Sequence, residues 1–152
     1  MIMVIKMNKY IILELIPTSS NPEYGEIIQL SALKIENLKL IDRFDYRIIE
    51  DKIPLKQLKE MISYDKDKFI YKNTKEEILK DFQEFVGDYP LLILNNGYTL
   101  KYLENINNIK KDISDYIGIP YSDDIIEKIM KKYNIEETNY IVDILYEALL
   151  LK

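Results

Sequence analysis

The chain has 152 residues, of which 47% are hydrophobic and 31% charged, and its formal net charge is −5. This length and composition are typical of one globular domain, which we expect to span residues 1–152. The chain has no cysteine, which excludes disulfides and thiolate metal sites, and no histidine, which excludes Ser-His and Cys-His catalysis. Hydrolytic chemistry would have to use carboxylates with Mg²⁺ or Mn²⁺.

The charge and the apolar segments also bear on partners and location. No apolar run reaches the roughly 18 residues that a membrane-spanning helix needs, so we expect a cytoplasmic protein without a membrane partner. Residues 1–8 are apolar but lack a cleavage site, and we interpret them as a leading strand or a disordered start. The mildly basic stretch Asp51–Lys80 is interpreted as solvated helix surface rather than a nucleic-acid patch.

Three segments near the start of the chain predict successive β-strands. Tyr10–Leu15 is apolar at nearly every position, which is typical of a central strand buried on both faces. After a loop of Pro, Ser and Asn, Glu26–Ile35 and Leu38–Phe44 are rich in β-favouring residues, and the second continues toward Ile49. The turn at Glu36-Asn37 predicts that these two form an antiparallel hairpin.

The rest of the chain predicts helices around one further strand. A short helix begins at Pro54, and a capping box at Thr74 opens a helix that ends at Gly87. The later elements are a strand at Leu91–Leu94, a helix at Tyr98–Ile106, a helical turn or short strand at Ile113–Ile117, a helix capped by Ser122 and a last helix capped by Thr138. This order predicts one α/β domain.

Four segments in this order resemble the DEDD-type 3′–5′ exonucleases, the DnaQ-like group that includes RNase T and the proofreading subunit of DNA polymerase III. They are YIILELIPTSSNPEYGEIIQLSALKIENLKLIDRFDYRI, IPLKQLKEMI, NTKEEILKDFQEFVGDYPLLILNNGYTLKYL and SDDIIEKIMKKYNIEETNYIVDILYEALLL. The resemblance implies a ribonuclease H-like mixed sheet, with a three-stranded antiparallel meander plus parallel strands, flanked by helices. It also implies the family's chemistry, in which four carboxylates hold two Mg²⁺ or Mn²⁺ ions.

The first motif of this family is an Asp-x-Glu pair, and the resemblance places it on Leu13 and Leu15. Neither side chain can bind a hard cation, which requires oxygen ligands. Glu14 lies between them, and we expect it on the opposite face of the strand, away from any metal. Sliding the register by one residue would supply one carboxylate and would turn the apolar side chains to the wrong face.

The second motif resembles LLILNNGYTLKYL, in which Asn95 and Tyr98 match the family's Asn and aromatic residue. The metal-binding Asp falls on Thr99. If the cleft still binds a nucleic acid, we expect Asn95, Asn96 and Tyr98 to contact it. A strand-to-helix turn is the simpler interpretation of the two asparagines.

The third motif keeps its carboxylate but not the residue that orients the water. Asp143 matches the last metal-binding Asp. The family's His falls on Thr138, and the Tyr of a related subfamily falls on Asn139. Since the resemblance leaves one carboxylate of four, we expect no catalytic residues, no metal ligands and no cofactor.

The leading hypothesis is therefore a catalytically inactive exonuclease-like domain. It would serve as a protein-interaction, accessory or inhibitory module that binds a protein partner or a second copy of itself. One alternative is a domain that binds nucleic acid without cleaving it. Another is a working exonuclease with displaced ligands, drawn from Glu14, Glu26, Asp42, Asp112, Asp115 and Asp143.

Overall fold

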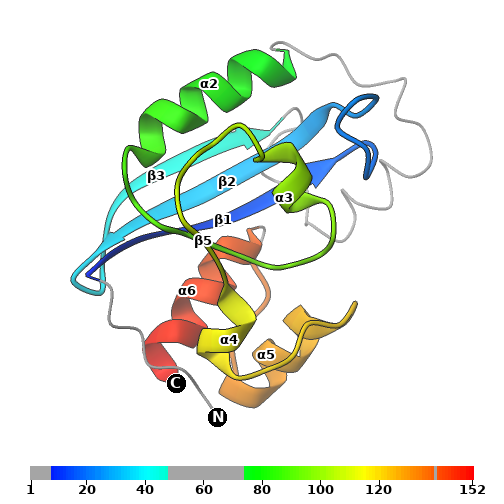
Figure 1. The fold of residues 1–152 in the computed structure, drawn as a ribbon. Coiled ribbons are helices and arrows are strands. Elements are labelled where there is room, and N and C mark those ends of the chain that lie inside the picture. Colours follow the sequence, from blue (N-terminus) through cyan, green and yellow to red (C-terminus); the bar gives the residue numbers. More distant parts are fainter. Residues whose placement is uncertain (1–7, 48–73, 139) are drawn as a thin grey trace.

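The computed structural model describes residues 8–47, 74–138 and 140–152, and these residues are arranged around one mixed sheet. Its five strands lie in the order β3-β2-β1-β4-β5. β1 pairs antiparallel with β2 and parallel with β4, so it is the central strand. The strands are β1 Lys9–Pro17, β2 Ile27–Glu36, β3 Lys39–Arg47, β4 Leu91–Ile93 and β5 Lys110–Asp112 (Figure 1).

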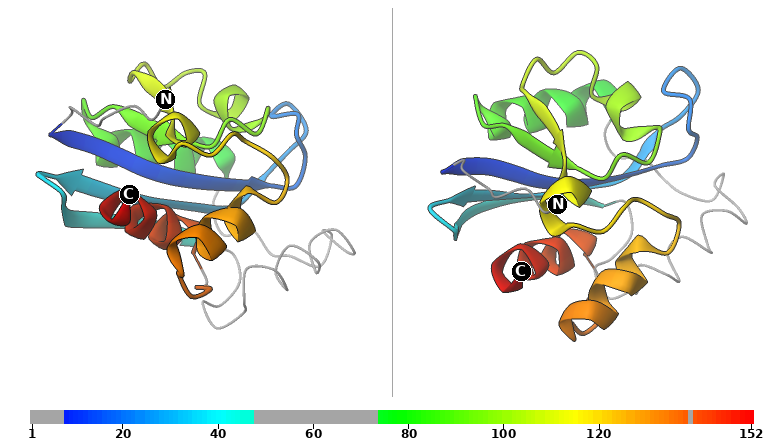
Figure 2. Two further views of the ribbon diagram at one scale, coloured as in Figure 1. Left: turned by 90° about the horizontal axis from the view of Figure 1, so that it is seen from below. Right: turned by 60° about the horizontal axis from the view of Figure 1, so that its bottom comes forward.

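Helices cover both faces of this sheet. α2 lies on one face, and α5 and α6 lie on the other (Figure 2). The helices are α2 Lys75–Val86, α3 Thr99–Tyr102, α4 Ile113–Ile117, α5 Ile125–Tyr133 and α6 Ile141–Leu151. The predicted mixed α/β sheet with its antiparallel meander is thus confirmed, whereas the helix predicted at Pro54 lies outside the described residues.

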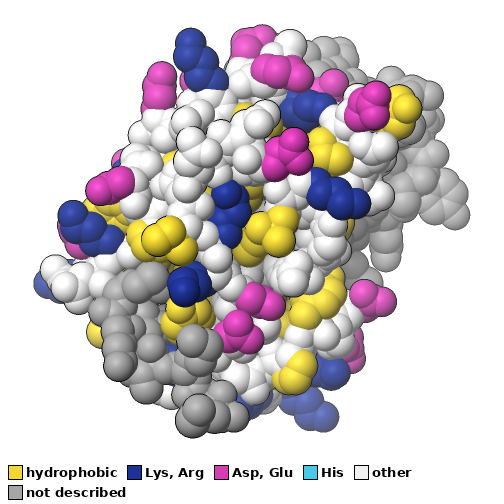
Figure 3. Space-filling model, in the orientation of Figure 1, with side chains coloured by type: hydrophobic (Ala, Val, Ile, Leu, Met, Phe, Trp, Pro, Cys, Tyr) yellow, Lys and Arg dark blue, Asp and Glu magenta, His cyan; other side chains and the backbone are white. Residues whose placement is uncertain are grey.

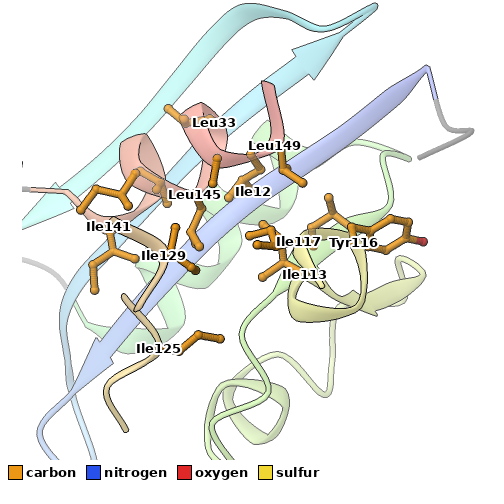
Figure 4. Packing of buried hydrophobic residues seen from close by; sticks show 14 of the residues in the cluster. Ile12, Leu33, Ile113, Tyr116, Ile117, Ile125, Ile129, Ile141, Leu145 and Leu149 are labelled. Carbon is orange, nitrogen blue, oxygen red and sulfur yellow. The ribbon is translucent and has the colours of Figure 1, made fainter. Parts of the chain in front are cut away.

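Burial on both faces explains why β1 is apolar along its length. Alternate residues of a strand point to opposite faces. Ile11, Leu13 and Leu15 pack with α2, where Phe82 is fully buried and contacts Phe44 edge to face at 5.5 Å. The side chains of the other face pack with α4, α5 and α6, as Figure 4 shows; those labelled are Ile12, Leu33, Ile113, Tyr116, Ile117, Ile125, Ile129, Ile141, Leu145 and Leu149.

Helix α2 begins and ends as the sequence predicts. The Thr74 hydroxyl accepts a hydrogen bond from the backbone N–H of Glu77, and the Glu77 carboxylate accepts one from the backbone N–H of Thr74. Gly87 ends the helix with a φ of 52°, a backbone conformation that glycine adopts without steric cost. The buried face of α2 consists of Ile78, Phe82 and Val86.

Four details of the later elements differ from the sequence prediction. The helix expected at Tyr98–Ile106 ends at Tyr102, because the chain turns there to reach β5, although Leu103 and Ile106 remain buried. Residues 113–117 form a helix, which is one of the two structures predicted for them, but the strand β5 before them was not predicted. Neither predicted cap is formed. The Ser122 hydroxyl donates to Asp124, and the Thr138 hydroxyl donates to the carbonyl of Tyr140.

Candidate functional site

A pocket lies where the central strand β1 extends beyond its parallel neighbour. The described β1–β4 pairs are Ile11 with Leu91 and Ile12 with Leu92, and β1 then continues to Pro17. In sheets of this kind, ligands bind outside the carboxyl ends of the parallel strands. The pocket is lined by residues 13–16 of β1, by Leu94, Asn96, Tyr98 and Thr99 after β4, and by Tyr121, Ser122, Asp123, Ile125, Ile126 and Ile141.

The face that each β1 side chain occupies corrects the expected position of the first motif. Leu13 and Leu15 border the pocket, but their side chains pack in the cluster of α2. Ile16 packs in the cluster of α6, the helix that carries Asp143, and strand alternation places Glu14 on that same face. The β1 positions that can converge with α6 are therefore 14 and 16, and the expectation that Glu14 points away from the site is wrong.

Glu14 is held within a buried polar group on this face of the sheet. Its side chain is 9% exposed, and its Oε1 accepts a hydrogen bond of 3.2 Å from Gln29 Nε2. The same Gln29 amide donates to Ser31 Oγ at 3.1 Å. Ser31 lies directly across the β1–β2 ladder from Glu14. Polar partners of this kind offset the cost of burying a carboxylate in a largely apolar sheet.

The residues of the second motif form the turn between β4 and α3. Asn96 Oδ1 accepts hydrogen bonds from the backbone N–H groups of Tyr98 and Thr99, at 3.2 and 3.0 Å, and from the Thr99 hydroxyl at 2.9 Å. Thr99 is buried, and it lines the pocket beside Asn96 and Tyr98. Asn95 is exposed and is not a lining residue. Asn96 thus has the structural role of holding the turn.

Asp143 does not line the pocket, because Arg43 of β3 binds it. Arg43 Nη1 and Nη2 donate to the two carboxylate oxygens at 2.8 and 3.1 Å. Arg43 also pairs with Asp45, and its guanidinium lies 4.7 Å from the ring centre of Tyr140. Bidentate pairing fixes the geometry of both side chains. In this structure the Asp143 carboxylate is thus held by Arg43 and does not meet the β1 motif at the pocket.

Thr138 and the proposed displaced ligands do not complete a site either. Thr138 binds the backbone of Tyr140 and is not among the pocket-lining residues. Within the described ranges, no group of three or more Asp or Glu side chains is placed to share a metal ion. Asp112, one of the proposed ligands, instead caps α4 by accepting from the backbone N–H of Ser114 at 3.0 Å.

Because several tyrosines are buried, we expect the stability of the fold to depend on pH in the alkaline range. Burial raises the pKa of Tyr98 to about 12, and the nearby charges of Glu14 and Tyr121 add to this effect. Burial is also the main cause that raises the pKa values of Tyr10 and Tyr102 to about 12. The folded state therefore favours the neutral phenols.

We expect the free energy of unfolding to fall as pH rises from about 10 to about 12. The contribution of these tyrosines is complete below pH 10, where they are neutral in both states, and it is lost as the pH passes through their folded-state values. Denaturant titrations at a series of pH values, with tyrosinate absorbance recorded in parallel, would measure this. Ionisation of every tyrosine near pH 10 without loss of structure would contradict it.

Two residues of this region were not identified from the sequence. Arg43 is 100 positions from Asp143, and its neighbours Asp42 and Asp45 offered equally good local partners. Tyr121 follows the break at Gly118 and Pro120, where no periodic pattern exists, yet it lines the pocket. A long-range salt bridge and a loop residue of this kind leave no local signal.

The alternative of a nucleic-acid-binding domain would require Lys and Tyr side chains around the Asn95–Thr99 turn and the Asp51–Lys80 segment. Tyr98 and Tyr121 line the pocket, whereas most of Asp51–Lys80 lies outside the described residues. On the face shown in Figure 3, acidic and basic side chains of the described residues are interspersed and form no continuous basic surface. Among the described residues, no helix combines the length and apolar character that crossing a membrane requires.

Comparisons with known proteins relate this chain to DNA-processing proteins. No family model matches it. PolC-type DNA polymerase III proteins of Staphylococcus aureus are 24% identical over 155 residues, which represent 90% of this chain and 10% of theirs. The chain therefore spans about a tenth of the length of these curated relatives.

The fold comparison agrees with the sequence comparison. E. coli ExoI, in the zinc-bound form of its complex with single-stranded DNA, superposes with a TM-score of 0.63 at 12% identity. The match covers 96% of this chain and 40% of the ExoI chain. The likeness to ExoI confirms the ribonuclease H-like fold. Together with the PolC similarity, it supports the resemblance to the DnaQ-like exonuclease superfamily that the motifs indicate.

Proposed function

We propose that this chain is a non-cleaving member of the exonuclease fold that acts as a protein-interaction or accessory module. The observation that carries the proposal is the state of the four carboxylate positions. Leucine occupies both β1 positions in the 13/15 register, and isoleucine occupies one of the two in the 14/16 register. Thr99 replaces the second-motif Asp. Asp143 is bound by Arg43 away from the pocket. Glu14 alone then cannot position two divalent ions for in-line attack.

The charge of the chain supports a protein partner or a second copy over a nucleic acid. A net charge of −5 opposes binding to a phosphate backbone. Several large apolar side chains are exposed on the described surface, and burial of such side chains is favourable in protein association. They include Leu38 in the turn before β3, Leu40 and Ile41 at the start of β3, and Leu150 and Leu151 at the end of α6.

A second candidate function is binding of single-stranded nucleic acid without cleavage. Its specific support is the likeness to ExoI, which was solved with single-stranded DNA. Fluorescence polarisation with short labelled strands at low salt tests it, since electrostatic binding is strongest there. Absence of binding at high micromolar protein would eliminate it.

For the main proposal, we expect no cleavage of single-stranded DNA or RNA above background with Mg²⁺ or Mn²⁺. Asp143→Ala should give the same background as the unmodified chain, because the proposal assigns Asp143 no catalytic role. An electrophoretic digestion assay with both proteins measures this. Mn²⁺-dependent cleavage that Asp143→Ala abolishes would show that the chain is a nuclease.

The interaction half of the proposal is tested by sedimentation over a wide range of protein concentration, alone and with a purified candidate partner. Self-association or a defined complex is expected. A monomer at every concentration that also forms no complex would oppose it.

A further inference from the structure

The turn between β2 and β3 exposes an apolar side chain at a position where the backbone disfavours it. Glu36 and Lys39 pair across the hairpin, and the two residues between them, Asn37 and Leu38, have φ values of 52° and 66°. Glycine adopts this left-handed region freely, whereas leucine does so only with steric strain. Leu38 is also 60% exposed, so burial within its own chain does not offset the strain. Strained residues of this kind cluster at functional sites.

Two hydrogen bonds hold this turn in a defined position. The backbone N–H of Asn37 donates to the carbonyl of Asn8 at 2.8 Å. The Tyr146 hydroxyl of α6 donates to the carbonyl of Leu38 at 2.8 Å. Because the turn is ordered in advance, Leu38 loses less conformational entropy on binding than a residue at the tip of a loose loop would.

The start of β3 continues this exposed surface. β3 lies at an edge of the sheet that the described strands form (Figure 1). Its first four residues, which we call the edge segment 39–42, are all exposed: Lys39, Leu40, Ile41 and Asp42. Leu40 and Ile41 are 44% and 49% exposed, although both are large apolar residues. The β2–β3 ladder has a bulge at Ile41, and a bulge limits how far a further strand could pair along this edge.

The order of side chains in the edge segment is complementary to itself. When two copies lie antiparallel, Lys39 of each copy can face Asp42 of the other, and Leu40 can face Ile41. Opposite charges and apolar pairs that face each other across strands are favourable. A two-fold axis forms each of these contacts twice. Charges at a sheet edge usually prevent association with other strands, and here the same charges favour a second copy in one register.

We propose that the chain forms a two-fold symmetric dimer in which the edge segments 39–42 of two copies lie antiparallel, flanked by Leu38. The inference rests on the proposed function, since it names the partner of an interaction module. Four strand residues and one turn residue per copy make a small contact, and interfaces below about 1,000 Å² are weak. We therefore expect a dissociation constant on the order of 100 µM.

The test is sedimentation equilibrium of the full chain from about 5 µM to about 500 µM. The variants Lys39→Asp and Asp42→Lys each place like charges opposite one another, and each should weaken association at least about fivefold. An equimolar mixture of the two variants restores opposite charges at both positions. The mixture should therefore associate about as tightly as the unmodified chain.

The matched control is Lys80→Glu at an exposed position of α2. It changes the net charge by the same amount as Lys39→Asp and should leave association unchanged. A monomer at every concentration would overturn the proposal. So would a dimer that the folded charge variants leave unchanged, or a mixture that associates no more tightly than either variant alone.

Leu38→Gly keeps the test decisive if a charge variant does not fold. It removes the exposed side chain and relieves the strain of the positive φ, so the melting temperature should rise. Association should nevertheless weaken at least about threefold, because the apolar contact with the second copy is lost. A more stable variant with unchanged association would overturn the role of Leu38 in the dimer.

The nuclease assay and a purified candidate partner separate this inference from the proposed function. Mn²⁺-dependent cleavage would contradict the proposed function, whereas sedimentation alone supports or overturns the dimer. A monomer that does not cleave nucleic acid but forms a defined complex with another protein leaves the proposed function standing and overturns this inference alone.

Discussion

The double substitution Leu13→Asp/Leu15→Glu is expected to unfold the protein rather than to restore a metal site. Both leucines pack in the cluster of α2, where they are 2% and 1% exposed. Each new carboxylate would lie among apolar neighbours such as Phe82, and an unpaired buried charge costs several kcal/mol. Since a domain of ordinary stability unfolds at a cost of about 5–15 kcal/mol, two such charges exhaust it.

Circular dichroism and urea denaturation would measure this effect, with and without Mn²⁺. The matched control is Leu13→Met/Leu15→Met, which keeps the apolar character and nearly the volume of both side chains. Each of those substitutions should cost less than about 1.5 kcal/mol. If the acidic variant folds and gains stability from Mn²⁺, then positions 13 and 15 carry the metal site and the assignment to positions 14 and 16 is wrong.

The fold was largely predictable because its central elements carry strong signals. β1, β2 and β3 are long and rich in β-favouring residues, and α2 has a complete capping box and a terminal glycine. β5 was missed since Lys110, Lys111 and Asp112 form a short polar edge strand, which local hydrophobicity cannot distinguish from a loop. The end of α3 depends on where the chain must turn toward β5, and this is a tertiary requirement.

The site was predicted less well, for a physical reason that lies in β1 itself. A strand with one wet face shows by its pattern which residues point inward, but β1 is buried on both faces. Positions 13 and 15 therefore look the same as positions 12 and 16 in the sequence. The packing of α6 on one face distinguishes them, and the Arg43–Asp143 pair becomes visible only when β3 and α6 are placed side by side.

Ile16→Glu/Thr99→Asp is the substitution expected to create a divalent-metal site in this pocket. Ile16 and Thr99 both line it together with Glu14. The variant would bring three carboxylates to one pocket, and like charges repel one another when no cation is bound. We therefore expect lower stability than the unmodified chain in EDTA and a recovery with Mn²⁺, of about 2.7 kcal/mol at a metal concentration 100 times the dissociation constant.

Thermal denaturation in EDTA and in a series of Mn²⁺ concentrations measures the recovery. The isosteric variant Ile16→Gln/Thr99→Asn lacks the new charges and should show no such dependence, which separates metal binding from a change of shape. Adding Arg43→Ala releases Asp143 from its bidentate partner and should strengthen Mn²⁺ binding if the freed carboxylate can reach the pocket. An Ile16→Glu/Thr99→Asp variant that folds and is indifferent to Mn²⁺ would contradict the placement of the former metal site on Glu14, Ile16 and Thr99.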